Sequence, residues 1–256
     1  MKAARGASSR RGFLLALLAV AVLGVAAITW ATSRGAQADV VTVDPRAAAG
    51  AKADGYVMGS ESAPVEIVEF ADFECPGCGQ FATVTEPDVR ERLVRTGKAR
   101  FRLFDFQVNP IHRNAPAASL AAACAADQGK FWEMHDRIFA GQNEWNTQAT
   151  SSPKTVFAGY ARAIGLNATT WEQCYDARTH MGRLAAHSEE AVRRGVGSTP
   201  SFIIADKQLA GAQPYDVIKA YVDSAAARVP AAAPVAPPAP GAPAAPAAPA
   251  ASAPGR

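Results

Sequence analysis

A β-rich segment that leads directly into two closely spaced cysteines constrains the fold more than any other feature of this sequence. Residues 64–70 read PVEIVEF, and the motif CPGC follows at 75–78. This pattern predicts a strand, a short loop and a helix that begins at Cys75 and extends to about Arg95. The next segment, ARFRLFDF at 99–106, alternates apolar and basic side chains as a half-buried strand does. We therefore expect a strand–helix–strand unit.

The remainder of the middle of the chain combines a long helical stretch with further strands. From about 112 to 194 the sequence is rich in alanine and is broken by glycines, which predicts several helices inserted at this point. Segments 201–205 and 207–210 predict two strands, and 214–227 predicts an amphipathic helix. The fold class is therefore expected to be α/β with an inserted helical subdomain.

The N-terminal residues 1–38 have the pattern of an export segment. Basic residues at 2, 5, 10 and 11 precede an uncharged, mainly apolar run from 12 to 33, and Ala36-Gln37-Ala38 offers a signal-peptide cleavage site. The run is also about as long as the ~20 residues that cross a bilayer. A cleaved signal peptide and a retained N-terminal membrane anchor therefore both remain open. Either one places the body of the protein outside the cytoplasm, in the periplasm or cell envelope.

The C-terminal residues 230–256 predict a disordered tail, because they contain 9 of the 18 prolines, 13 alanines and a single charged residue. Residues 39–229 then form the foldable part, which is long enough for one well-buried core. This part carries 20 basic and 23 acidic side chains, and the net charge of +3 of the whole chain comes from its two ends. Nucleic-acid-binding domains are usually basic, so we expect no nucleic acid partner.

The CPGC motif points to redox chemistry. A cysteine in the first turn of a helix receives backbone N–H groups and the positive end of the helix dipole, so Cys75 is expected to form a thiolate readily. Cys78 lies one turn later, where its sulfur can attack that of Cys75. The alternatives are half of a zinc site or a purely structural disulfide. A zinc site of this kind needs a second pair of ligands, whereas Cys124 and Cys174 are far apart and solitary.

In the order of its motifs, the sequence resembles the DsbA-like thiol:disulfide oxidoreductases of the thioredoxin superfamily. The matching elements run from GSESAPVEIVEFADFECPGC through FDF, HRNAPAASLAAACAADQGKFWEMHDRIF and VGSTPSFII to the final helix, over residues 55–228. The resemblance implies a thioredoxin-like fold for 39–229, with a helical insertion at about 112–194. Strong oxidants of this family often carry a histidine before the second cysteine, where this chain has Gly77.

The resemblance also implies the roles of several residues. The Thr199–Pro200 bond is expected to be cis and to lie against the dithiol, with backbone groups of Ser198 and Thr199 offered to an extended substrate. The alternative is a rigid turn before a strand. Glu69 occupies a position where relatives carry a buried acid that exchanges protons with Cys78, and the alternative is a solvated carboxylate at the end of the strand.

Cys124 and Cys174 fall in the helical insertion, where many relatives have a second, non-catalytic disulfide. Structural pairing of these two cysteines is favoured over two free buried thiols. The four histidines, at 112, 135, 180 and 187, show no convincing metal-ligand spacing, and we expect core or surface histidines. No cofactor and no bound metal are predicted.

The function predicted from these features is that of an extracytoplasmic enzyme, a monomer that forms disulfides in exported cysteine-containing proteins through Cys75 and Cys78. A redox partner in the membrane would reoxidise the dithiol. One alternative is a disulfide reductase or isomerase that works in the opposite direction. Another is a carrier that binds a soft metal such as copper(I) with the two thiolates.

Overall fold

The computed structural model describes residues 6–34, 41–107 and 110–229. Its sheet has five strands in the order β1-β3-β2-β4-β5. Strand β2 is parallel to β3 and antiparallel to β4, and the edge strands β1 and β5 are antiparallel to their neighbours. The bounds of the strands are β1 (Tyr56–Met58), β2 (Glu66–Ala71), β3 (Arg100–Asp105), β4 (Ser201–Ile204) and β5 (Lys207–Ala210). The predicted α/β fold class is confirmed, and β1 is an additional strand that the sequence analysis did not predict.

The central strand β2 lies between β3 and β4, and it is buried on both faces because helices cover both sides of the sheet. Side chains alternate along a strand, so Ile67, Glu69 and Ala71 point to one face of the sheet and Val68 and Phe70 to the other. The carboxyl end of β2 leads through a short loop to Cys75. The alternation thus places the Glu69 carboxyl on one defined side of the sheet, close to the start of the helix that follows.

One helical run follows the CPGC motif, as predicted. It consists of α2 (Pro76–Gln80), η2 (Phe81–Thr85), α3 (Glu86–Val89) and η3 (Arg90–Val94). Pro87 lies in the middle of this run and has no N–H to donate to the preceding turn, and wider π-helical turns flank it on both sides. Gly97 then adopts a φ of 73°, which glycine tolerates, where the chain turns towards β3.

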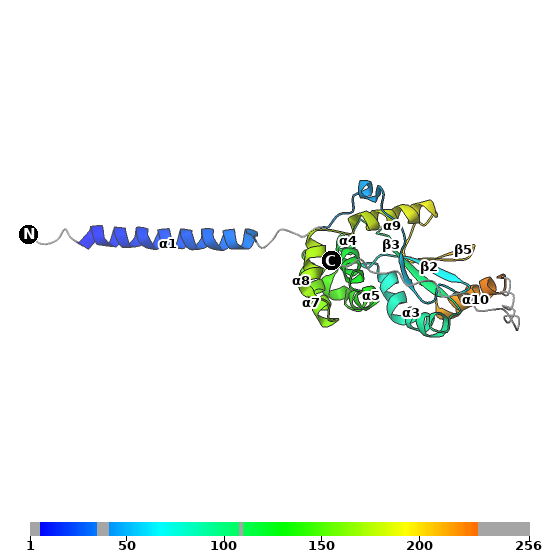
Figure 1. Ribbon diagram of the computed structural model, residues 1–256. Coiled ribbons are helices and arrows are strands. Elements are labelled where there is room, and N and C mark those ends of the chain that lie inside the picture. The colour runs from blue at the N-terminus through cyan, green and yellow to red at the C-terminus, as the bar shows by residue number, and fades with distance from the viewer. Residues whose placement is uncertain (1–5, 35–40, 108–109, 230–256) are drawn as a thin grey trace, which may run out of the picture.

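Helices cover both faces of the sheet (Figure 1). On one face lie the run from Pro76 to Val94 and α10 (Tyr215–Ala226), and Phe81 packs against Phe202 of β4 with ring centroids 4.5 Å apart. The opposite face is covered by α9 (Met181–Arg193), and its small hydrophobic cluster includes Phe70 and Phe104.

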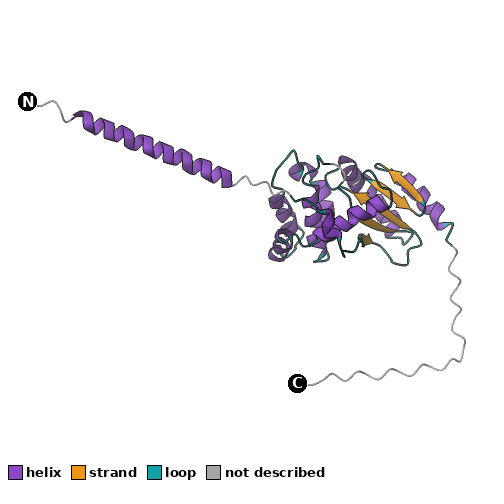
Figure 2. Cartoon of the chain, turned by 90° about the horizontal axis from the view of Figure 1, so that it is seen from above, coloured by secondary structure: helices purple, strands orange, loops and turns teal. Residues whose placement is uncertain are grey.

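Five helices of the predicted insertion gather at one end of the sheet (Figure 2). They are α4 (Ala115–Ala126), α5 (Phe131–Ala140), α6 (Gln142–Trp145), α7 (Lys154–Ala163) and α8 (Ala168–Asp176). Together with α9 they occupy the interval between β3 and β4 in which the sequence predicts inserted helices. The alanine-rich α4 is almost entirely buried, and its Ala121 carbonyl accepts a hydrogen bond of 3.0 Å from the indole of Trp171 in α8.

The N-terminal segment forms α1 (Gly6–Arg34), followed after a gap by the short η1 (Pro45–Ala48). Within the described part of the chain, no helix is both long enough and apolar enough to cross a membrane. The predicted cleavage site at 36–38 and the predicted tail at 230–256 lie outside the described residues.

Candidate active site

The two cysteines of the CPGC motif occupy different environments at the start of α2. Cys75 is the last residue before the helix and has an extended backbone, and Pro76 occupies the first helical position. The Cys75 side chain is partly exposed, whereas that of Cys78 is fully buried. Both thiols are free. A reagent from solvent therefore reaches the sulfur of Cys75 and not that of Cys78.

Hydrogen bonds at the helix start favour the ionised form of Cys75. They lower its pKa from 9.0 to about 5. The largest contribution is the thiol of Cys78, and the backbone N–H groups of Cys78 and Gly77 and the side chain of Thr199 act in the same direction, while burial opposes them. Cys75 is therefore a thiolate at neutral pH, which makes its sulfur a good leaving group in disulfide exchange.

The buried partner, Cys78, keeps its proton. Its pKa is raised well above the ordinary value by burial first, and then by the hydrogen bond to Cys75 and by the negative charges of Cys75 and Glu69. The backbone N–H of Asp72 donates to its sulfur over 3.4 Å. The two thiols of one motif thus differ strongly in acidity.

Glu69 lies beneath the dithiol with only 2% of its surface exposed. Its pKa is raised well above the usual range, chiefly by burial and then by the charge of Glu86, and Arg90 partly offsets this effect. Sequence reasoning missed Glu86, because a glutamate four residues before an arginine on a helix is usually a solvated pair. Here the Glu86 side chain is fully buried and contacts the Arg90 guanidinium over 2.5 Å.

The loop before β4 lies against the motif. The Thr199–Pro200 peptide bond is cis, and the sulfur of Cys75 lies 3.4 Å from the Thr199 carbonyl oxygen, to which it can donate only as a thiol. A Cβ atom on Gly77 would lie 3.2 Å from Cδ of Pro200, so a larger residue would crowd this ring. Ser198 is exposed, but its carbonyl already accepts a hydrogen bond of 2.7 Å from Ser201.

A pair formed by the buried Asp72 and the half-buried His112, beside the dithiol, was not predicted. The Asp72 carboxylate contacts Nδ1 of His112 over 2.9 Å, and its other oxygen accepts the backbone N–H of Glu74 over 2.8 Å. The hydrogen bond to Asp72 raises the pKa of His112 above its usual value, while burial raises that of Asp72. The two residues are forty positions apart in the sequence, so no local pattern could reveal the pair.

The helical insertion holds the active-site segment in place. Glu74 accepts the backbone N–H of Asn114 over 2.9 Å and also that of Thr147. The side-chain amide of Gln142 in α6 donates to the carbonyl of Phe73 over 2.7 Å and to that of Cys75 over 3.1 Å. These bonds fix the backbone on the N-terminal side of the motif.

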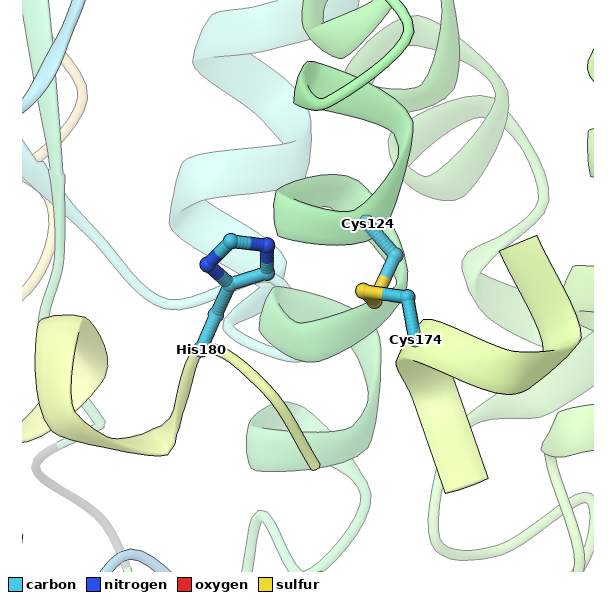
Figure 3. Close-up of side chains that lie close together, drawn as sticks. All are labelled: Cys124, Cys174 and His180. Carbon is cyan, nitrogen blue, oxygen red and sulfur yellow. A yellow bond between two sulfur atoms is a disulfide. The ribbon is translucent and has the colours of Figure 1, made fainter. Parts of the chain in front are cut away.

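Cys124 of α4 and Cys174 of α8 form a disulfide bond, the pairing that the family resemblance implies, and their Cα atoms are 5.8 Å apart. Figure 3 shows His180 beside this bond. Among the described residues, these three form a cluster close enough to share a metal ion, but both sulfurs are joined to each other. The Nε2 atom of His180 contacts Asp127 over 2.8 Å.

Comparison with known proteins places this geometry in a family. Residues 51–224 match the family model described as thioredoxin. The protein named disulfide bond formation protein D of Bacillus subtilis is 23% identical over 167 residues, which are 65% of this chain and 75% of that protein. A protein named Na(+)/H(+) antiporter NhaA 3 of Salinispora tropica is 35% identical over 170 residues, 66% of this chain. The match spans only 24% of that antiporter's length.

Solved structures show the same fold. The structure of alpha-DsbA1 from Wolbachia pipientis superposes with a TM-score of 0.61 at 19% identity, over 70% of this chain and 94% of that one. Oxidised BdbD from Bacillus subtilis gives a TM-score of 0.59 at 21% identity, over 74% of this chain and 98% of that one.

The acidity of Cys75 can be measured directly. We expect the ultraviolet absorbance of the thiolate in the reduced protein to titrate with a midpoint of about 5. Because this pKa lies below the unfolded value of 9.0, ionisation stabilises the reduced fold fully above 9.0, and the stabilisation is lost as the pH falls through 5.

Replacing Cys78 tests the cause of this acidity. Cys78→Ala removes the hydrogen bond that lowers the pKa of Cys75 most, so the midpoint of the Cys75 titration should rise. Cys78→Ser retains a donor and should raise this midpoint less. A wild-type midpoint near the ordinary value of 9.0 would contradict the geometry described here.

The second disulfide should contribute stability and leave the dithiol unchanged. Its two cysteines are 50 positions apart, and closing a loop of this length stabilises a fold by about 4 kcal/mol in the chain-entropy model. Replacing Cys124 and Cys174 together with alanine should lower the melting temperature by roughly 10 °C, while the titration of Cys75 stays the same. A double variant that melts at the wild-type temperature would be the contrary result.

Proposed function

The chain belongs to the thioredoxin family, among its DsbA-like thiol:disulfide oxidoreductases, and on this basis we propose that it forms disulfide bonds in exported cysteine-containing proteins. The redox-active pair is Cys75 and Cys78. The observation that carries this proposal is the contrast between the two sulfurs, since Cys75 is accessible with a pKa of about 5 and Cys78 is buried with a raised pKa.

The first step of the proposed reaction is the attack of a substrate thiolate on the sulfur of Cys75 in the oxidised pair. The bond between Cys75 and Cys78 breaks, and a mixed disulfide forms between the substrate and Cys75. Cys78 leaves with the electron pair and must take up a proton, because its buried thiolate is unfavourable. Glu69 is the buried acid on the same side of the sheet, and its raised pKa keeps a proton ready for this transfer.

The second step releases the product. A second thiolate of the substrate attacks the substrate's own sulfur in the mixed disulfide, and Cys75 leaves as a thiolate. Two electrons pass from the substrate to the Cys75–Cys78 pair. Hydrogen bonds that stabilise the Cys75 thiolate make it a better leaving group and favour the reduced form of the pair, which drives oxidation of the substrate. An oxidising partner in the membrane then accepts the two electrons and restores the disulfide.

The loop of Thr199 and Pro200 is the proposed substrate-binding element. It lies against Cys75, and an extended peptide with its cysteine at this sulfur would run beside the Thr199 backbone. Because the Ser198 carbonyl is already bonded to Ser201, Thr199 offers the main contact and Ser198 a secondary one.

We also propose that the protein acts outside the cytoplasm, in the periplasm or cell envelope, after export directed by residues 1–38. The basic and apolar pattern of this segment supports the proposal. The disulfide between Cys124 and Cys174 also supports it, because such bonds persist in oxidising compartments and are rare in the cytosol.

Substitution of the two cysteines separates their roles. Cys75→Ser should reduce the oxidation of a dithiol peptide to background, because the attacked sulfur is lost. In Cys78→Ser the Cys75 thiolate can attack the disulfide of an oxidised peptide, and the resulting mixed disulfide should stay trapped on Cys75, since no internal thiol remains to release it. The measurements are peptide oxidation by the preoxidised wild-type protein and mass analysis of trapped complexes. Substantial exchange by Cys75→Ser, or complexes formed on another residue, would refute the assignment.

A further inference from the structure

His112 lies next to the active site although it is far from the CPGC motif in the sequence. Its Nδ1 atom contacts the Asp72 carboxylate over 2.9 Å. The backbone of Asp72 contacts both cysteines, because its carbonyl accepts the N–H of Cys75 over 3.0 Å and its N–H donates to the sulfur of Cys78 over 3.4 Å. The imidazole is thus fixed to the residue that joins β2 to the dithiol.

We propose that His112, held by Asp72, is an imidazolium that stabilises the Cys75 thiolate, so that reduction of the Cys75–Cys78 disulfide is coupled to the binding of a proton at His112. This inference rests on the proposed disulfide exchange at Cys75. In this proposal the role of His112 is electrostatic. The imidazolium acts on the sulfur of Cys75 through its charge and does not itself react.

The interaction between the two groups works in both directions. The hydrogen bond to Asp72 raises the pKa of His112 most, burial lowers it, and the negative charges of Asp72, Glu74 and then Cys75 raise it further. By linkage, a thiolate that favours the protonated imidazole is favoured by it to the same extent. Because the pKa of Cys75 is about 5, His112 is charged over the whole range in which this thiol ionises.

Proton balance shows what the coupling achieves. Oxidation of a substrate dithiol releases two protons, and Cys78 retains one of them when it becomes a thiol. Cys75 remains a thiolate, so the second proton is free to leave. His112 takes up part of this proton when the pH is near its own pKa, because the imidazole binds a proton more tightly beside the thiolate than beside the disulfide. The reduced state is thereby stabilised.

Other charged groups around His112 set the size of this effect. Asp72, Glu74 and Cys75 act on it from the active-site segment. A cavity of about 760 Å³ is lined by His112 together with charged side chains of both signs, namely Arg113, Glu189 and Arg193. The negative charge of Asp72 offsets part of the field of the imidazolium at the sulfur, so the expected effect is smaller than that of an unpaired cation.

The position of the His112 imidazole also bears on the CPGC motif, which has Gly77 where strong oxidants of the family often carry a histidine. At Gly77 the Pro200 ring leaves little room for a side chain. His112 contacts Asp72, the residue whose backbone bonds to both cysteines, and so places an imidazole beside the dithiol where the motif itself has none.

Titration of the histidine rings in the full-length protein tests the coupling without any substrate. Nuclear magnetic resonance of the oxidised and reduced protein should show a pKa of His112 that is higher in the reduced state by at least about 0.3. His180 is the matched control, because it also contacts an aspartate, Asp127, but lies beside the other disulfide. At a fixed pH, the ring signals of His180 should be the same in the oxidised and the reduced protein.

Two variants test the reciprocal effect on Cys75. His112→Gln keeps a hydrogen-bond donor for Asp72 but removes the charge, and should raise the midpoint of thiolate absorbance by at least about 0.3, which is about a twofold fall in the ratio of thiolate to thiol. His112→Arg keeps the charge and should retain the wild-type midpoint. His180→Gln should change nothing at Cys75.

An equal pKa of His112 in the oxidised and reduced protein would overturn the inference, as would an unchanged Cys75 midpoint in His112→Gln. Neither result would affect the proposed exchange activity, which is judged by peptide oxidation. The wild-type resonance measurement remains decisive if a variant fails to fold.

Discussion

The chemistry of the active site depends on the stabilisation of the Cys75 thiolate at the start of helix α2. The Cys78 thiol, two backbone N–H groups and the Thr199 side chain all favour the thiolate of Cys75. These donors are in place only because β2 ends just before the motif and because Pro76 starts the helix without needing a hydrogen bond of its own. The disposition of the chain around Cys75 therefore determines its chemistry.

The same sheet makes the two cysteines unequal. Burial in the layer between β2 and the helix raises the pKa of Cys78 and of Glu69, while Cys75 stays at the surface. The helical insertion contributes by holding the active-site backbone through Gln142 and the partners of Glu74. The sheet and the helix that follows the motif thus set the acidity of the two sulfurs, and the helical insertion keeps their geometry fixed.

Local patterns in the sequence predicted much of this arrangement. The strand before the motif and the helix to about Arg95 follow from side-chain periodicity and from signals at the helix start. Strand β1 escaped prediction because it has only three residues, with one of them buried. The Asp72–His112 pair and the contacts of Glu74 escaped because they join residues forty or more positions apart, which no periodic pattern reports.

The reduction potential of the Cys75–Cys78 pair tests the central claim most directly, because stabilising the Cys75 thiolate stabilises the reduced protein and makes the disulfide more oxidising. Equilibration of the purified protein with glutathione, followed by mass analysis of the two redox states, gives this potential. The account predicts a value well above that of thioredoxin, about −270 mV, and towards that of DsbA, about −120 mV. A potential at or below that of thioredoxin would contradict it.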